Sequence, residues 1–442
     1  MQTAGPFWCC TIRPVGRRVL SFCLFFWICA GVFAQNSAKS KLSYKLLSIH
    51  VRGLQQFKED EVIAASGLKL GQYAGEPEFQ QAAQKLGETG LFANLSYKYQ
   101  YSNAGCNLDL EVEENIKLVP ILFDNFVWFS DAELLAMLKS RMPLFDGRVP
   151  AGGNLTDRVA EKLKDILSDR KIFGETDYLP AAALNGPITS YLYKVALHPI
   201  VIHNVEFPGA SQSEALALQE AAKPLLQQEY SRSKMRVQEQ HNFLPVYLSR
   251  GYLKATFADS EAKVVEDGPQ TFVNVGLPVT PGLQYKLENT EWVGNTVFPA
   301  DQLQPLIHLK IGEAADAVQL ATDLEEVQKL YGTKGYIQAS VDAEPEMNDA
   351  SPSVNYELKI SEGDLYRMGD LTIDGIPSQN ADKMAQQWQL KKGEPYDKSY
   401  LQKFFKVMYH DVGLRVPYNV VPKEAVDQEE KTVSVALHFM PK

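Results

Sequence analysis

Histidine is a common metal ligand and general base, so a metal or catalytic site would first be sought among the histidines. No two of them form a His-Glu-x-x-His pattern, and none stands near a cysteine pair at zinc-ligand spacing. The 442 residues contain no glycine-rich phosphate loop, and no serine sits in a nucleophile elbow. We therefore expect no enzyme, no cofactor and no metal. The seven histidines are scattered: His50, His198, His203, His241, His308, His410 and His438.

The charge balance excludes another class of function. The chain has 44 basic and 54 acidic residues, a formal net charge of −10. Binding to nucleic acid depends on lysine and arginine displacing counterions from phosphates. We therefore expect no nucleic-acid partner. Hydrophobic residues make up 45% of the chain and charged residues 22%, which is typical of folded domains.

The first 34 residues resemble a secretory signal peptide. Arg13, Arg17 and Arg18 precede an uncharged run from Val19 to Ala34, with small or medium residues just before Gln35. The run is shorter than the roughly 20 residues of a comfortable membrane helix, although an uncleaved anchor is the alternative. Four of the five cysteines lie in this segment, so its removal would leave no internal disulfide. The fifth, Cys106, fits a partly buried strand position better than a reactive thiol.

A short pattern recurs along the remainder of the chain. Apolar residues alternate at period two and end at a glycine, which predicts a half-buried strand followed by a left-handed or closely packed residue. The copies end at Gly53, Gly209, Gly294 and Gly375, and an asparagine, Asn125, fills the gap in the middle. Asparagine is the next most tolerant residue of a left-handed conformation. The sequence therefore predicts five units of about 80 residues.

Two further glycines mark most units. Gly71, Gly312 and Gly393 each follow the first glycine by 18 residues, after a short amphipathic helix. A longer helix with an apolar stripe comes next, and it ends at a glycine in four units. An alternating strand pair then closes the unit, which predicts one covered sheet face and one solvated face. The glycines that end the longer helices are Gly90, Gly251, Gly335 and Gly413.

The predicted fold class is α+β: a linear array of five β-α-α-β-β units, each a three-stranded mixed sheet with two helices on one face. The joints are short and patterned, because Gly282 and Tyr285 precede Gly294 at the same spacing as Gly363 and Tyr366 precede Gly375. Short joints favour units in contact over flexible linkers.

This order of motifs resembles the POTRA (polypeptide-transport-associated) domain, and five copies behind a signal peptide resemble the periplasmic arm of BamA-type outer-membrane assembly factors. The second unit matches poorly and is divergent. Because the last predicted strand ends three residues before the C-terminus, we expect the arm without a membrane barrel. The implied organisation is a signal peptide at 1–34 and units at 44–115, 116–198, 199–281, 282–364 and 365–442.

The resemblance also implies where such an arm would bind. The second strand of each unit should be an exposed edge, at 96–101, 253–257, 337–343 and 416–421, where an extended peptide could add a strand. The alternative is that these edges are solvated, covered by a neighbour, or in the first unit simply part of the core. If the edge at 96–101 is used, proline at Lys98 should weaken peptide binding and leave the fold of the unit intact. The candidate residues are Tyr97, Lys98, Tyr99, Tyr101, Ala255, Phe257, Ser340, Val341, Tyr418 and Val420.

The resemblance therefore predicts a non-enzymatic periplasmic scaffold associated with the outer membrane. It would bind unfolded or β-rich polypeptides by strand addition and assist outer-membrane protein assembly or secretion, together with a separate β-barrel protein or assembly lipoproteins. The alternatives are a structural protein anchored at its N-terminus in the inner membrane, similar to the division protein FtsQ, and a truncated BamA-like protein.

Overall fold

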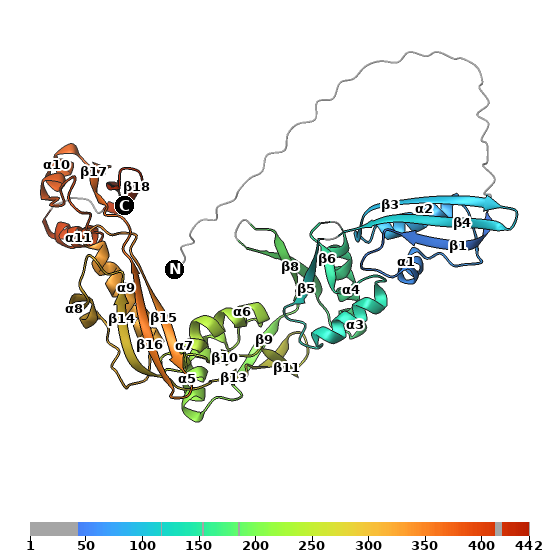
Figure 1. The fold of residues 1–442 in the computed structure, drawn as a ribbon, viewed down its shortest axis with the longest axis horizontal. Coiled ribbons are helices and arrows are strands. Elements are labelled where there is room, and N and C mark those ends of the chain that lie inside the picture. Colours follow the sequence, from blue (N-terminus) through green and yellow to red (C-terminus); the bar gives the residue numbers. More distant parts are fainter. Residues whose placement is uncertain (1–42, 116, 153, 184–185, 412–417, 442) are drawn as a thin grey trace, which may run out of the picture.

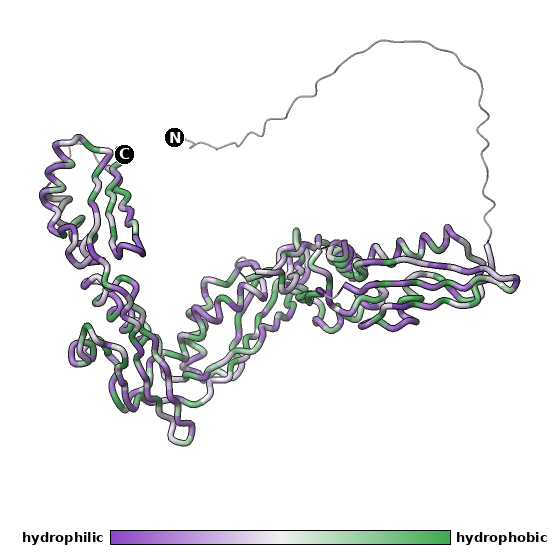
Figure 2. The backbone as a smooth tube through the Cα atoms, turned by 45° about the horizontal axis from the view of Figure 1, so that its top comes forward, coloured by the Kyte–Doolittle hydropathy of each residue, from purple (hydrophilic) through white to green (hydrophobic). Residues whose placement is uncertain are grey.

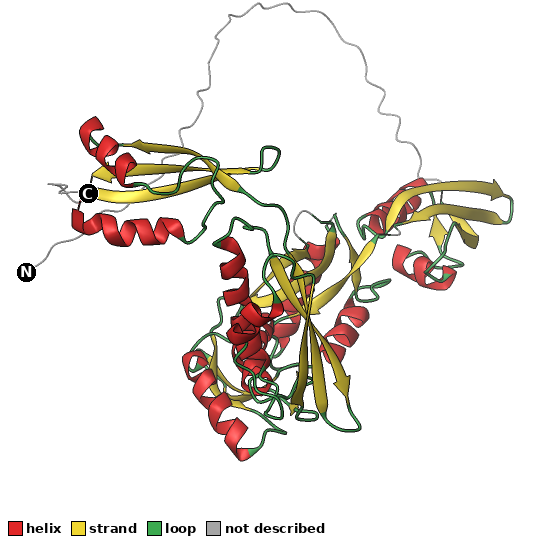
Figure 3. Cartoon of the chain, turned by 60° about the vertical axis from the view of Figure 1, so that its left-hand side comes forward, coloured by secondary structure: helices red, strands yellow, loops and turns green. Residues whose placement is uncertain are grey.

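The computed structural model describes residues 43–115, 117–152, 154–183, 186–411 and 418–441. The expected signal peptide at 1–34 and the expected helix-ending Gly413 lie outside these residues. The described chain has a mixed α+β fold, and its sheets follow one another in sequence order along an extended arrangement (Figure 1). Helices lie against strands in each part of it (Figure 3).

Five sheets of three or four strands share one topology. In each, a central strand pairs in parallel with the first strand and antiparallel with an outer strand. We number these sheets 1 to 5, with strand orders β2-β1-β4-β3, β6-β5-β8-β7, β11-β12-β9, β14-β16-β15 and β17-β19-β18.

Sheets 1 and 2 each gain a short fourth strand between their two helices, paired with the first strand. The elements around sheet 1 are β1 (Tyr44–Arg52), α1 (Glu59–Ser66), β2 (Tyr73–Ala74), α2 (Glu76–Gly87), β3 (Phe92–Ser102) and β4 (Gly105–Glu114). Those around sheet 2 are β5 (Leu118–Phe123), α3 (Asp131–Arg141), β6 (Arg148–Pro150), α4 (Leu155–Asp169), β7 (Glu175–Ala182) and β8 (Ile188–Ala196).

Sheet 3 is less regular, because its second helix contains a π-helical segment and a separate two-stranded sheet, β10-β13, lies beside it. Its elements are β9 (Ile200–Glu206), α5 (Gln212–Ala222), η1 (Lys223–Leu225), α6 (Arg232–Gln238), η2 (Glu239–Phe243), α7 (Leu244–Leu248), β10 (Thr256–Phe257), β11 (Glu261–Glu266), β12 (Thr271–Gly276) and β13 (Val279–Thr280).

Sheets 4 and 5 complete the chain. The elements of sheet 4 are β14 (Lys286–Val293), α8 (Ala300–Leu303), η3 (Gln304–Leu306), α9 (Ala317–Gly332), β15 (Ser340–Asn348) and β16 (Ser353–Ser361). Those of sheet 5 are β17 (Arg367–Asp374), α10 (Ser378–Gln387), α11 (Tyr400–Asp411), β18 (Tyr418–Asp427) and β19 (Thr432–Pro441).

The expected amphipathic patterns form the cores. In α4, Leu155, Val159, Leu163 and Ile166 are all buried, and Cys106 is a buried strand residue in β4. Hydrophilic and hydrophobic residues alternate along much of the tube in Figure 2, as period-two and helical patterns require. The α3 helix begins with the predicted capping box, in which the Ser130 side chain and Glu133 satisfy each other's backbone N–H groups. In the described part of the chain, no helix combines the length and apolar character needed to span a membrane.

Candidate peptide-binding edges

Each of the five sheets ends in an outer strand that forms an antiparallel hairpin with the central strand. These outer strands are β3, β7, β11, β15 and β18, and no other described strand pairs with their outer sides. An outer strand leaves half of its backbone N–H and C=O groups free to pair with a further strand. The candidate residues are therefore best judged by their place on these edges.

Four candidate residues lie in β3, the outer strand of sheet 1. Tyr97 and Tyr99 pack against Phe79 of α2, with ring centroids 6.4 and 5.3 Å apart. Their hydroxyls donate to the Glu76 carboxylate at the start of the same helix. Burial and the Glu76 carboxylate raise the pKa of Tyr97, so the phenol stays protonated as a donor. Tyr101 is 43% exposed at the end of this row.

Lys98 points to the other side of β3 and pairs with Glu111 at 2.9 Å. The Val112 carbonyl is directed toward β1, since a Cβ on Gly53 would lie 2.0 Å from its oxygen. Leu110 and Leu108, which oppose Tyr97 and Tyr99, share that direction by alternation along β4.

The backbone groups of Tyr97 and Tyr99 therefore face outward, whereas those of Lys98 face Asp109 inside the ladder. The expectation that proline at Lys98 tests the free edge without disturbing the fold is wrong, because it would remove a bond of the sheet itself.

The expected edge of the third unit at 253–257 is also wrong. Thr256 and Phe257 form β10, which pairs with β13, and Ala255 is buried. The outer strand of sheet 3 is instead β11, which follows four residues later in the chain. Phe257 packs against Phe243 and Tyr247, so its aromatic ring belongs to the core between helix and strand.

The remaining candidates lie on outer strands as expected. Ser340 and Val341 begin β15, where Val341 is buried and Ser340 half-buried. Tyr418 and Val420 begin β18, and both are half-buried. Val416, also in that predicted segment, lies outside the described residues.

The glycines at the ends of the first strands share one packing role. Gly53, Gly209, Gly294 and Gly375 all have positive φ, and a Cβ on any of them would lie 2.0 to 2.3 Å from a carbonyl oxygen of the central strand or its continuation. Gly71, Gly312 and Gly393 also have positive φ, but a Cβ there would meet nothing within 4 Å. These glycines serve conformation alone.

Asn125 fills the equivalent place in sheet 2 by another means. Its φ is not positive, so the expected left-handed conformation is wrong. Its side-chain amide instead forms a two-way pair with Val195: Nδ2 donates to the carbonyl at 3.1 Å, and Oδ1 accepts from the N–H at 2.7 Å. Asn125 is 4% exposed, so these bonds are shielded from water.

The helix-ending glycines join neighbouring sheets. Gly251 accepts the N–H of Tyr285, and Gly335 accepts that of Tyr366, at 2.8 and 2.9 Å. A Cβ on either glycine would lie 2.5 Å from the tyrosine carbonyl oxygen. Gly90 also has positive φ, and a Cβ there would touch Pro150 at 3.4 Å. Neighbouring sheets are thus in direct backbone contact at these glycines.

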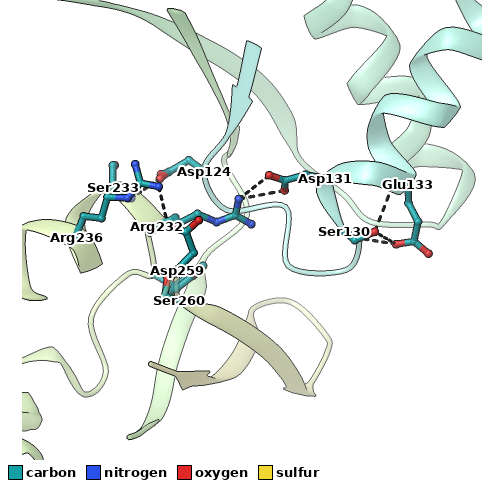
Figure 4. Close-up of polar contacts among 10 residues, drawn as sticks. Asp124, Ser130, Asp131, Glu133, Arg232, Ser233, Arg236, Asp259 and Ser260 are labelled. Carbon is teal, nitrogen blue, oxygen red and sulfur yellow. Dashed lines mark hydrogen bonds and ion pairs between the residues drawn. The ribbon is translucent and has the colours of Figure 1, made fainter. Parts of the chain in front are cut away.

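Polar contacts also connect sheets 2 and 3, as Figure 4 shows. Arg232 at the start of α6 pairs with both carboxylate oxygens of Asp131, at 3.1 and 2.9 Å. The next residue, Ser233, donates its N–H to buried Asp124 at 2.8 Å. On α6 itself, the hydrogen bond from Arg236 lowers the pKa of Asp259. Both bonds come from the same guanidinium nitrogen, Nη1, and this charge-assisted contact joins α6 to α3.

Two glutamates not identified from the sequence, Glu114 and Glu362, hold the loops following Gly53 and Gly294. Glu114 at the end of β4 accepts N–H groups of residues 55–57, and Glu362 beyond β16 accepts those of Thr296 and Val297, both at 2.7 Å. Tyr331 also donates to Glu362 at 2.9 Å. Burial raises the pKa of Glu362, but these hydrogen bonds outweigh it and hold the pKa below its usual range. For Glu362 the available signal was its place directly before Gly363, whereas Glu114 is followed by Asn115.

No group of three or more potential metal ligands gathers among the residues that the structure describes. Three histidines lie in described strands: His438 pairs with Asp374, His50 lies 3.6 Å from Glu59, and the ring of His203 lies beside Phe272.

Comparison with known proteins identifies one segment directly. Residues 285–363 match the POTRA family, described as the surface antigen variable number repeat. The chain is 24% identical over 195 residues to a Treponema pallidum protein provisionally named as an outer membrane protein assembly factor, covering 43% of this chain and 23% of that protein. It is 23% identical over 167 residues to the outer membrane protein assembly factor BamA of Neisseria meningitidis, covering 38% and 21%. The alignments thus span less than a quarter of either relative.

Solved structures of the same kind are also similar. POTRA domains 3–5 of Haemophilus influenzae BamA align with 55% of this chain and 96% of their own, with 21% identity and a TM-score of 0.42. POTRA domains 1–3 of Omp85 from Anabaena align with 55% and 95%, with 14% identity and a TM-score of 0.25. Together with the family match, the sequence relatives confirm the expected resemblance: this is a repeat chain with a POTRA domain at residues 285–363, and it resembles BamA-type outer-membrane assembly factors.

Proposed function

We propose that the chain is a non-enzymatic periplasmic scaffold that binds unfolded or β-rich polypeptides by strand addition. Five POTRA-like units, at 44–115, 116–198, 199–281, 282–364 and 365–442, would each supply one mixed sheet with two helices on one face. The scaffold would act at the outer membrane in protein assembly or secretion, in contact with a β-barrel protein or assembly lipoproteins.

The observation that carries this proposal is that the outer side of β3 is unpaired among the described strands. This strand is eleven residues long, and its outer backbone groups pair with no described strand. Main-chain hydrogen bonds are common to all polypeptides, so a free edge can receive clients of many sequences. Alternating side chains then provide modest selectivity between them.

A direct binding experiment tests the proposal. An outer-membrane protein unfolded in urea is diluted into buffer with and without the full chain, and aggregation and complex formation are followed by light scattering and size exclusion. We expect a soluble complex and delayed aggregation. Unchanged aggregation with no complex at micromolar concentrations would contradict the proposal. A folded client serves as the control, since its strands are already paired.

The cellular part of the proposal has its own test. Crosslinking in intact cells, followed by purification from envelope membranes, should recover an outer-membrane β-barrel protein. Sequencing of the N-terminus of the same sample should find a start at Gln35. Recovery of inner-membrane proteins alone, with the N-terminus intact at Met1, would instead support an anchored structural protein.

A further inference from the structure

We propose that sheet 1 is the open strand-addition edge of this chain, and that sheets 2, 4 and 5 are closed to such addition by a proline on their outer strands. This inference rests on the proposed function, which it narrows from five edges to the outer side of β3. The three prolines are Pro180 in β7, Pro345 in β15 and Pro422 in β18.

The direction of each proline nitrogen follows from the strand register. In sheet 4, the Ile360 carbonyl points to β14, because a Cβ on Gly294 would lie 2.3 Å from its oxygen. Residues of β16 alternate in direction, so Tyr356 also pairs toward β14. Pro345 stands opposite Tyr356 and is therefore not paired with it by ladder bonds. Its nitrogen faces the outer side of the sheet, where a new strand would need an N–H donor.

Sheets 2 and 5 repeat this arrangement. In sheet 2, the Tyr193 carbonyl points toward β5, because it accepts the N–H of Asp124 at 2.9 Å. Tyr191, two residues earlier, points the same way. Pro180 stands opposite Tyr191, so its nitrogen faces outward. In sheet 5, a Cβ on Gly375 would lie 2.0 Å from the Phe439 oxygen. Leu437 shares that direction, and Pro422 stands opposite it. Proline lacks the donor, so an outward proline interrupts any added ladder.

Sheet 3 limits its outer strand differently. The Leu277 N–H points toward β9, because it donates to the Glu206 carbonyl at 2.8 Å, and by alternation Val275 and Val273 point the same way. Ala262 and Val264 stand opposite these two valines, so their backbone groups face outward from β11. The strand has only six residues and a register shift between Val264 and Glu266. A short, bulged edge offers few consecutive bonds.

The outer strand of sheet 1 has none of these features at its centre. Leu95, Tyr97, Tyr99 and Tyr101 direct their N–H and C=O groups outward, and its one register shift lies at the start of the strand. The eleven residues of β3 match the roughly 9–11 residues of a strand that crosses the outer membrane.

The side chains of β3 define the chemistry of the occupant. One face presents the tyrosine row beside α2, and the other presents exposed Ser96, Lys98 and Gln100. Cross-strand pairs of aromatic or β-branched residues on one face, with polar pairs on the other, favour an extended segment whose residues alternate between apolar and polar. Unfolded strands of outer-membrane barrels have this alternation.

Proline at Tyr99 closes the proposed edge. The probe is a fluorescein-labelled ten-residue peptide in which phenylalanine or valine alternates with threonine, measured by fluorescence anisotropy with the full chain. We expect Tyr99→Pro to weaken binding at least about tenfold. Tyr99→Val removes the ring but keeps the N–H, so it should bind within about threefold of the wild type. Ala343→Pro, on the outer side of the already closed β15, is the matched control and should change nothing.

Valine at Pro345 tests the reverse, because it restores a donor on the outer side of β15. Calorimetry should show one peptide bound to the wild-type chain and a second bound to Pro345→Val. Circular dichroism confirms that each variant folds before binding is measured.

Failure of the inference and failure of the proposed function give different results. Wild-type binding that survives Tyr99→Pro, or a single peptide still bound by Pro345→Val, would overturn the assignment of edges and leave strand addition in place. If neither the wild type nor a variant with all three edge prolines replaced by valine binds the peptide, strand addition itself is refuted.

Discussion

Alanine at Gly294 and at Gly312 separates the two reasons for which the repeat uses glycine. Both residues have φ of +85° and belong to the same part of the chain. At Gly312 a Cβ meets nothing within 4 Å, whereas at Gly294 it would lie 2.3 Å from the Ile360 oxygen. A left-handed conformation costs alanine about 1–2 kcal/mol at either position.

The clash at Gly294 adds a second cost. A Cβ and an oxygen essentially never approach within 3.0 Å, so β14 and β16 would have to separate by at least about 0.7 Å. That movement weakens the neighbouring ladder bonds, each of which contributes about 1 kcal/mol. We expect a total loss of about 3–4 kcal/mol for Gly294→Ala and about 1–2 kcal/mol for Gly312→Ala.

Hydrogen exchange of the full chain under increasing urea measures both variants. Amides of β14 and β16 report the opening free energy of this sheet, without requiring the whole chain to unfold in one step. Gly294→Ala should lower that free energy by about 2 kcal/mol more than Gly312→Ala. Equal losses would refute the packing role of Gly294, and unchanged protection in both would refute the conformational role as well.

Three further perturbations test other parts of the structure. Folding lowers the pKa of Glu362, so its contribution to stability is present above its unfolded pKa and is lost as the pH falls through the folded value. Thermal melts from pH 7 to 3 should therefore show a fall in the melting temperature of the wild type. The fall should be smaller for Glu362→Gln. Asn125→Ala leaves the buried N–H and C=O groups of Val195 unpaired, and should lower the free energy of unfolding by about 2–4 kcal/mol, as measured by urea unfolding followed at β8. Asn125→Gly should lower it by at least as much. If glycine instead restored the stability, the role of the side chain would be contradicted. Arg232→Ala removes the ion pair with Asp131, so the distribution of distances between spin labels on sheets 2 and 3 should broaden. An unchanged distribution would show that other contacts hold the joint.

Much of the fold could be predicted because it depends on periodicity. Strands of alternating apolar and polar residues, helices with one apolar face, and a glycine at the end of the first strand are local patterns that recur at a regular spacing. The departures are positions where local patterns do not determine the outcome. Just after β5, the Asn125 side chain forms two hydrogen bonds with the Val195 backbone. No feature of the neighbouring sequence distinguishes this arrangement from a left-handed backbone at Asn125.

The edges were harder to predict because they depend on strand partners. Residues 253–257 alternate like a strand, yet β13 supplies a local partner and β11 becomes the outer strand of sheet 3. The direction of an N–H depends on register, which is set by pairing between distant residues. The directions of the backbone groups of Lys98 and Pro345 are therefore set by pairing with distant residues and not by their own neighbours in sequence.

The most direct measurement of strand addition is residue-resolved hydrogen exchange of the full chain with and without an unfolded outer-membrane protein. The outward amides of Tyr97, Tyr99 and Tyr101 should gain protection when the client binds. The amides of Lys98 and Gln100, already within the ladder with β4, should change little, so that protection gained along β3 alternates. A uniform change along β3, or new protection confined to β7, β15 and β18, would contradict strand addition at this edge.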